Sequence, residues 1–157
     1  MTKELLYSGP IFDVIRDDGK DIVVHGPSVT IVPVDLDGRV TLVRQQRPAA
    51  HGKLLELPAG GLEEGERPIE AARRELREET GLHGGEWVEV ATFFTTPGFC
   101  DEKMHLFIAR QLEAGEAEPE ESEDLELVRI ALDDVPSLLD EIEDAKTLAG
   151  LLFLLRL

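Results

Sequence analysis

Three glutamates, Glu75, Glu78 and Glu79, lie within one short stretch of the chain. At about 100° per residue, they fall together on one side of the helix that the surrounding residues predict. Like charges at this spacing repel one another. A solvated acidic face is one interpretation. The other is a site for a hard divalent cation, which prefers oxygen ligands and would offset the repulsion.

The remaining metal-binding residue types do not cluster in the sequence. A zinc site requires grouped cysteine and histidine ligands, and the pattern therefore argues against zinc. A single cysteine also excludes an intramolecular disulfide and fits a reducing cytoplasm. The scattered residues are His25, His51, His83, His105 and Cys100.

The sequence around the glutamates predicts one amphipathic helix. Pro68 suits its first turn, and Gly81 suits the position just past its end. Arg74 and Glu78 lie four residues apart and can pair on the helix surface. The apolar residues between the two ends fall on one narrow face, which we expect to be buried: Ile69, Ala72 and Leu76.

Short segments rich in β-branched residues surround this helix, and the Asp-Gly pairs at 18–19 and 37–38 predict hairpin turns. We expect one domain, 1–157, with an α+β fold in which helices cover a mixed β-sheet. The predicted strands are 11–17, 20–26, 28–36, 39–45, 54–60, 86–94, 103–112 and 127–132, and the predicted C-terminal helices are 137–144 and 145–157.

The net charge of -17 argues against nucleic acid and anionic membrane surfaces as partners, because both require basic patches. A phosphorylated small molecule remains compatible with this charge if a metal screens it. The N-terminus has no apolar core of the kind found in signal peptides. The apolar C-terminal run is too short to span a bilayer.

Residues 60–82, GGLEEGERPIEAARRELREETGL, resemble the Nudix box at each of its fixed positions. The resemblance implies the Nudix α/β/α sandwich and hydrolysis of a nucleoside diphosphate linked to another group. It also implies Mg²⁺ as the cofactor, with Mn²⁺ as an alternative. Such a cation neutralises the pyrophosphate oxygens that otherwise resist attack.

The same resemblance assigns roles to individual residues. Glu75 and Glu79 are the expected metal ligands, together with the backbone carbonyl of Ala59. Glu78 is the next candidate ligand and a candidate catalytic residue, with Arg74 orienting it. Glu66 has a simpler expected role at the helix N-terminus, where the helix dipole favours a carboxylate.

Further segments are similar to the ADP-ribose pyrophosphatase branch of the family. Pro97 lies 15 residues after Leu82, and residues 97–102, PGFCDE, look like a loop in which the glutamate, here Glu102, contacts the terminal ribose. The alternative is a Pro-Gly turn with exposed acidic residues. Residues 43–48, VRQQRP, make Arg47 a candidate substrate ligand, although an exposed strand-end arginine is an alternative.

Two more segments extend this likeness. Residues 55–60, LELPAG, match the branch, and Glu56 is either structural or a substrate contact. Residues 120–124 resemble its acidic loop, in which Glu121 would be the general base and Glu123 an additional metal ligand. A charged flexible segment is the alternative, since eight carboxylates lie between residues 113 and 126.

The resemblance implies a cytoplasmic enzyme that cleaves ADP-ribose to AMP and ribose 5-phosphate. Another nucleoside diphosphate sugar is an alternative substrate, and a non-catalytic nucleotide-binding Nudix domain is an alternative function. Family members are commonly homodimers whose N-terminal strands cross to the partner. Residues 1–27 are the candidates for that role, whether or not the strands swap.

Overall fold

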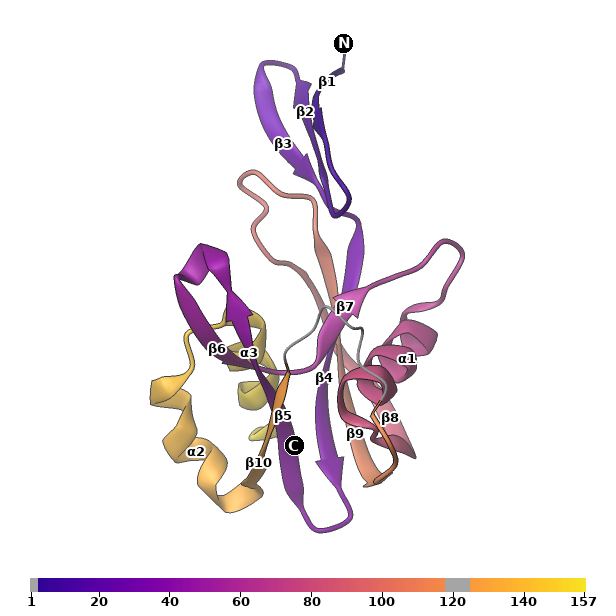
Figure 1. The fold of residues 1–157 in the computed structure, drawn as a ribbon, viewed down its shortest axis with the longest axis vertical. Coiled ribbons are helices and arrows are strands. Elements are labelled where there is room, and N and C mark those ends of the chain that lie inside the picture. Colours follow the sequence, from indigo (N-terminus) through magenta and orange to yellow (C-terminus); the bar gives the residue numbers. More distant parts are fainter. Residues whose placement is uncertain (1–2, 118–124) are drawn as a thin grey trace.

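A computed structural model describes residues 3–117 and 125–157. The chain forms a small N-terminal sheet and a larger mixed sheet with helices on both faces, which is the predicted α+β class (Figure 1). Within the described ranges, no helix is both long enough and apolar enough to cross a membrane. The predicted single domain stays a prediction.

The N-terminal sheet is an antiparallel meander that extends away from the rest of the molecule (Figure 1). Its strands are β1 (Glu4–Ser8), β2 (Asp13–Asp17) and β3 (Lys20–Val24). The predicted turn between β2 and β3 is present, with left-handed φ values of 50° at Asp18 and 76° at Gly19. Asparagine, aspartate and glycine tolerate this conformation better than other residues, which is why this pair can close the hairpin.

The larger sheet has the order β10-β5-β4-β9-β8, with β6 paired to β5 and β7 paired to β4. Among the paired strands of this sheet in residues 3–117 and 125–157, only β4 and β9 run parallel, which makes the sheet mixed. β4 is buried along almost its whole length because helices cover both of its faces. The strands are β4 (Pro27–Asp35), β5 (Arg39–Arg47), β6 (Gly52–Glu56), β7 (Ala59–Gly61), β8 (His83–Phe94), β9 (Lys103–Glu113) and β10 (Glu126–Ala131).

Helices α1 (Pro68–Thr80) and α3 (Ala145–Leu154) cover opposite faces of this sheet. The predicted limits of α1 are confirmed, and Gly81 ends it with φ 74°. The predicted helix over 137–144 is wrong in extent. That region is a four-residue helix, α2 (Val135–Leu138), followed by a 3-10 turn, and the extended backbone of Ile142 ends it. The 3-10 turns are η1 (Pro48–Ala50), η2 (Leu132–Asp134) and η3 (Leu139–Glu141).

Two apolar layers hold the sheet and helices together. Val29 and Ile31 of β4 point toward α1, while Val32 and Val34 point toward α3, as expected from the alternation of side chains along a strand. The predicted apolar face of α1 lies in the first layer, where Ala72 and Leu76 are fully buried and Ile69 is partly buried.

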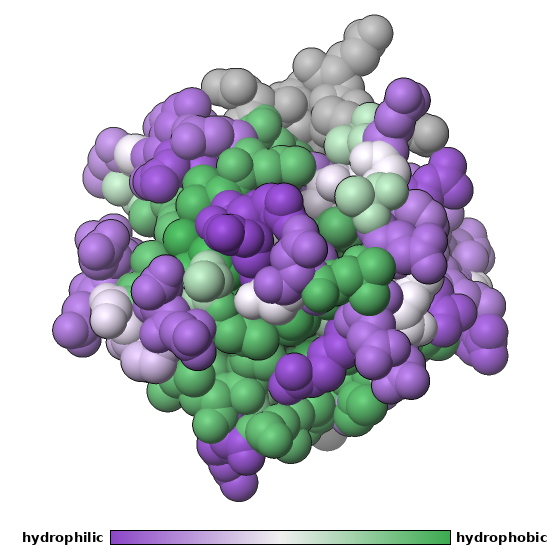
Figure 2. Space-filling view, turned by 90° about the horizontal axis from the view of Figure 1, so that it is seen from below, coloured by the Kyte–Doolittle hydropathy of each residue, from purple (hydrophilic) through white to green (hydrophobic). Residues whose placement is uncertain are grey.

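The end of the molecule opposite the N-terminal sheet carries a broad hydrophobic area bordered by hydrophilic residues (Figure 2). The turn between β4 and β5 lies at this end (Figure 1), and Leu36 in this turn is largely exposed. The polar residues singled out from the sequence gather elsewhere, where β7 meets α1 and where the β8–β9 loop approaches α3.

Candidate active site

The candidate metal ligands lie where β7 packs against α1. Ala59 and Gly60 pair with β4, which fixes the β7 backbone beside the helix. The carboxylate of Glu75 lies directly over Gly60, and a Cβ atom at this glycine would be 2.1 Å from Cδ of Glu75. Any side chain at position 60 would therefore displace this carboxylate, which explains the glycine at the start of the box.

Arg74 organises the carboxylates on and before α1. Its Nη1 donates to Glu75 Oε1 at 2.8 Å and to Glu78 Oε2 at 3.2 Å. Its Nε and Nη2 each donate to Glu66 at 3.0 Å, and Nη2 also donates to the Gly61 carbonyl at 2.9 Å. The hydrogen bonds with Glu66 are the main reason why the pKa of Arg74 rises, and those with Glu75 add to it.

Glu66 lies directly before the N-cap residue of α1, so its predicted interaction with the helix dipole stays a prediction, and the structure adds a contact with Arg74. Helix α1 begins at Pro68, so Glu66 lies in the preceding loop, and its carboxylate faces Arg74 and accepts from the Glu63 backbone at 3.0 Å. Glu70 instead accepts from the backbone at the start of the helix, from Arg67 N–H at 3.1 Å. The contact with Arg74 also lowers the pKa of Glu66.

The donor atoms at this position fit a hard divalent cation. Carboxylates of Glu75 and Glu79 and the carbonyl of Ala59 offer oxygen ligands, which Mg²⁺ and Mn²⁺ prefer. Glu79 is only 4% exposed, and a carboxylate in such surroundings requires compensating charge. Within residues 3–117 and 125–157, no three acidic, histidine or cysteine side chains already converge as a metal cluster. In this arrangement the guanidinium of Arg74 supplies positive charge to Glu75 and Glu78.

A cavity of about 430 Å³ adjoins this metal position. It brings together three predicted residues from distant parts of the chain: Arg47 from the end of β5, Ala59 from β7 and Glu102 from the β8–β9 loop. The pKa of Arg47 is raised mainly by its hydrogen bonds with Glu56, and the negative charge of Glu79 on α1 makes a smaller contribution. Arg47 and Glu102 therefore line one cavity with Ala59, and a single site that also includes Glu75 and Glu79 stays a prediction.

Glu56 lies beneath this cavity and is only 1% exposed. It accepts two hydrogen bonds from Arg47, at 2.8 and 2.9 Å, and one from Nζ of Lys146. Burial alone opposes its ionisation, but the hydrogen bonds and charges of Arg47 and Lys146 outweigh it and lower the pKa of Glu56. The buried carboxylate thus holds the positively charged side chains of Arg47 and Lys146 at the cavity. Direct contact between Glu56 and substrate stays a prediction.

Glu102 is held in place by two hydroxyl groups. Ser28 Oγ donates to one carboxylate oxygen at 2.6 Å, and Thr95 Oγ1 donates to the other at 2.7 Å. The loop that carries Glu102 is anchored to the N-terminal sheet, because Val23 N–H donates to the Phe99 carbonyl at 2.8 Å. The β8–β9 loop is therefore a supported part of the cavity wall.

Sequence reasoning missed Lys146, Ser28 and Thr95, which all line the cavity. Lys146 lies in the first turn of α3, and Asp144 caps this helix by accepting from Thr147 N–H at 2.9 Å. A lysine in the first turn of an otherwise apolar helix was the available signal. Two predicted residues, Glu121 and Glu123, lie outside the described residues.

The family model of the NUDIX domain matches residues 24–151. The chain belongs to the Nudix family. The matched region contains the whole box and the 430 Å³ cavity residues named above, from Ser28 to Lys146. It excludes β1, β2 and most of β3, so the N-terminal sheet is largely an addition to the common Nudix domain.

Similar proteins cover nearly the whole of this Nudix chain. It is 35% identical to an ADP-ribose pyrophosphatase of Bacillus subtilis, over 98% of this chain and 90% of the relative. It is 32% identical to a methanol dehydrogenase activator of Bacillus methanolicus, over 96% of this chain and 89% of the relative. A crystal structure of an ADP compounds hydrolase superposes with a TM-score of 0.81 at 26% identity, covering 99% of this chain and 90% of that chain. The Nudix fold predicted from the box is therefore confirmed.

Proposed function

We propose that this Nudix protein hydrolyses the pyrophosphate bond of ADP-ribose to give AMP and ribose 5-phosphate. The observation that carries the proposal is the single cavity in which Arg47 and Glu102 meet the β7 end of the box. Relatives named ADP-ribose pyrophosphatase and ADP compounds hydrolase support the same substrate class.

The proposed cofactor is Mg²⁺, with Mn²⁺ as an alternative. Glu75, Glu79 and the Ala59 carbonyl would hold it, and Glu123 would add a ligand. When bound, the cation neutralises pyrophosphate charge and lowers the pKa of water. Arg74 would keep Glu75 and Glu78 oriented, since its guanidinium already joins both.

The substrate would be bound from two sides of the cavity. Arg47 offers guanidinium donors to a phosphate, and Glu56 keeps these donors in place. Glu102 can accept hydrogen bonds from the hydroxyls of the terminal ribose. A carboxylate has about four lone-pair positions, and Ser28 and Thr95 occupy two of them.

The proposed general base is Glu121. A carboxylate bound to a cation is a weak base, so the proton acceptor should be a carboxylate other than Glu75 or Glu79. Glu78 is the candidate on α1, where its side chain is 39% exposed and paired with Arg74.

We also propose a cytoplasmic homodimer in which the N-terminal sheet contacts the second subunit. Every residue of β1 is exposed in the single chain. Several of the sheet's apolar side chains are exposed too, and burying them between subunits would be favourable: Leu5, Leu6, Tyr7, Ile11 and Phe12. Light scattering of the purified chain measures its mass, and a monomer at micromolar concentration would contradict this proposal.

A substrate panel with Mg²⁺ tests the proposed reaction, with products identified by chromatography. ADP-ribose should be cleaved to AMP and ribose 5-phosphate with the highest kcat/KM, and EDTA should abolish cleavage. GDP- and UDP-sugars represent the alternative substrates. Preference for one of them would correct the substrate, whereas binding of nucleotides without cleavage would indicate a non-catalytic Nudix domain.

A further inference from the structure

His25 lines the 430 Å³ cavity, and the proposed function gives it no role. It lies between the last residue of β3, Val24, and the first residue of β4, Pro27. The next residue, Gly26, has a left-handed φ of 84°, and a Cβ atom on it would meet nothing within 4 Å, so the turn rather than a lack of space requires glycine. An imidazole therefore lies at the cavity where the chain turns from the N-terminal sheet into the larger one.

The backbone of His25 is fixed to the loop that carries Glu102. The His25 N–H donates to Asp101 Oδ1 at 2.8 Å, and the Gly26 N–H donates to the same oxygen at 3.4 Å. The Asp101 N–H donates in turn to the Val23 carbonyl at 3.1 Å. Because Asp101 directly precedes Glu102, these bonds set the position of His25 relative to Glu102 before any ligand binds.

The imidazole of His25 faces the carboxylate of Glu102 across a narrow gap. Nδ1 of His25 lies 3.8 Å from Oε1 of Glu102, and the two side chains are 27% and 20% exposed. This separation is too long for a hydrogen bond, but an oxygen atom can lie about 2.8 Å from both atoms at once. A single hydroxyl group of a ligand can therefore bridge them. Its O–H would donate to Glu102, and its oxygen would accept from His25.

The surroundings of the imidazole favour a hydrogen atom on Nδ1. Two groups lie near this nitrogen, the Gly26 carbonyl at 3.4 Å and the Glu102 carboxylate at 3.8 Å, and both are acceptors. The neutral ring therefore favours the Nδ1–H tautomer, and the imidazolium carries this hydrogen in any case. Neither acceptor is close enough for a strong hydrogen bond, so the donor remains available to a ligand.

Glu102 provides the matching acceptor. Ser28 Oγ donates to one of its oxygens at 2.6 Å and Thr95 Oγ1 to the other at 2.7 Å, so each oxygen retains a lone-pair position. Among the residues that the structure describes, His25 is the one basic side chain within ion-pair distance of this carboxylate. The two residues thus form a donor and acceptor pair on the cavity wall.

We propose that His25 is a specificity-determining residue, whose Nδ1–H donates to the same hydroxyl of the terminal ribose that donates to Glu102. The pair requires one group that both donates and accepts. It would therefore favour a sugar with a free hydroxyl over one in which this hydroxyl is absent or esterified. This inference rests on the proposed hydrolysis and adds a residue outside the box to its substrate recognition.

The test compares two substrates with Mg²⁺. One is ADP-ribose, and the other is the ethyl ester of ADP at its terminal phosphate, which keeps the pyrophosphate but lacks the terminal sugar. His25→Ala should lower the ratio of their kcat/KM values about three- to tenfold, which is the effect of one hydrogen bond between uncharged groups. Equal losses on both substrates would show that His25 only supports the structure and would overturn the proposal.

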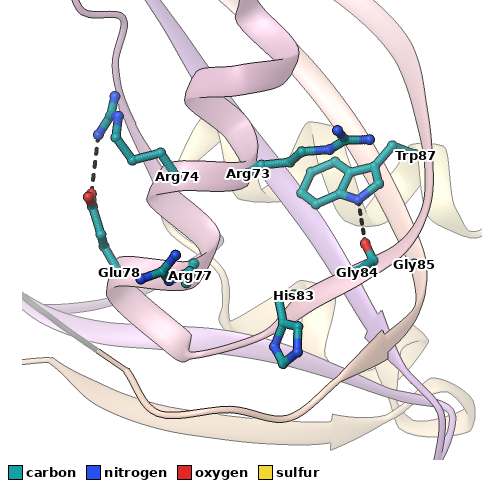
Figure 3. Close-up of a pocket in the computed structure, with 8 residues that line it drawn as sticks. All are labelled: Arg73, Arg74, Arg77, Glu78, His83, Gly84, Gly85 and Trp87. Carbon is teal, nitrogen blue, oxygen red and sulfur yellow. Dashed lines mark hydrogen bonds and ion pairs between the residues drawn. The ribbon is translucent and has the colours of Figure 1, made fainter.

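His25→Asn tests the assignment to Nδ1, because an amide N–H can take the position of this donor, and it should keep most of the wild-type ratio. The matched control is His83→Ala. His83 lies at the start of β8 beside a different cavity (Figure 3), and its Nδ1 is 3.3 Å from a backbone carbonyl, much as in His25. This variant should keep the wild-type ratio. A ratio for His25→Asn as low as that of His25→Ala, or an equal fall in His83→Ala, would overturn the proposal.

Failure of the proposed hydrolysis can be distinguished from failure of this inference. A wild-type chain that cleaves neither substrate would refute the hydrolysis. Calorimetry in EDTA then compares the affinities for ADP-ribose and the ethyl ester without turnover. A three- to tenfold fall in the affinity ratio of His25→Ala, as estimated above, would support the role of His25. Equal ratios in His25→Ala and the wild type would overturn it.

Discussion

Replacing Glu56 with glutamine should destabilise the protein and weaken substrate binding together. The substitution keeps the shape of the side chain but removes a negative charge that is 1% exposed and faces Arg47 and Lys146. Breaking a buried ion pair costs about 3–5 kcal/mol. The cost here should be lower, about 2–3 kcal/mol, because Arg47 is 42% exposed and Lys146 keeps Asp144 at 3.0 Å.

Calorimetry or circular dichroism measures the stability change. At about 2–4 °C per kcal/mol for a chain of this size, the expected fall in Tm at pH 7 is about 4–12 °C. KM for ADP-ribose should rise, since Arg47 loses the carboxylate that orients it. The matched control is Glu64→Gln, an exposed carboxylate before α1, whose Tm and KM should stay at wild-type values.

The difference in Tm between the wild type and Glu56→Gln should depend on pH. The pKa of Glu56 in the folded protein lies below its ordinary value of 4.5, so its ionisation stabilises the folded state above pH 4.5. This stabilisation is lost as the pH falls through the lower folded-state pKa. The difference between wild type and Glu56→Gln should therefore be full at pH 7 and should narrow below pH 4.5. A Tm within 2 °C of wild type at pH 7, or a difference that does not narrow in acid, would refute the reasoning.

The remaining predictions concern metal, ribose and the box glycine. Glu79→Gln should lower kcat by orders of magnitude while Tm is retained, and near-normal turnover at limiting Mg²⁺ would contradict the metal assignment. Glu102→Gln should reduce kcat/KM for ADP-ribose more than for a pyrophosphate substrate without the terminal ribose, and equal losses would show a general role. Gly60→Ala should abolish most activity, because the Cβ atom of the alanine would lie 2.1 Å from Glu75 Cδ. The control is Gly61→Ala, in which the added Cβ atom would meet nothing within 4 Å. Equal activity of the two variants would exclude this clash.

The parts of the fold that local sequence determines could be predicted well. Pro68 and Gly81 mark the ends of α1 because the first position tolerates a missing N–H and the last requires a left-handed φ. The helix over 137–144 could not be predicted in this way. Its apolar residues suit a helix, but Ile142 is extended and 6% exposed, so packing against the core determined its conformation instead.

Only those residues of the candidate site that belong to a short sequence motif could be predicted. The Glu75 and Glu79 positions follow from the box, but one of the two contacts that hold Glu102 joins residues 74 positions apart, from Ser28 to the β8–β9 loop. The contact between Lys146 and Glu56 spans 90 positions. Neither pairing leaves a periodic pattern, because tertiary structure alone brings β4, β6, α3 and this loop together.

Three arginines of this acidic chain, Arg74, Arg47 and Arg73, contact different kinds of side chain. These contacts indicate which hydrogen-bond donors each arginine has left for a ligand. Arg74 is engaged by Glu66, Glu75 and Glu78, so it can orient carboxylates but has few donors left for a substrate. Arg47 is held along one edge by Glu56 and remains 42% exposed, which leaves its other donors for a phosphate. Arg73 lies over the ring of Trp87, with Cζ 5.7 Å from the ring centroid, and this contact uses none of its hydrogen-bond donors. Side chains with the same charge thus differ in function because carboxylates occupy hydrogen-bond donors, whereas an aromatic ring restrains a guanidinium without using them.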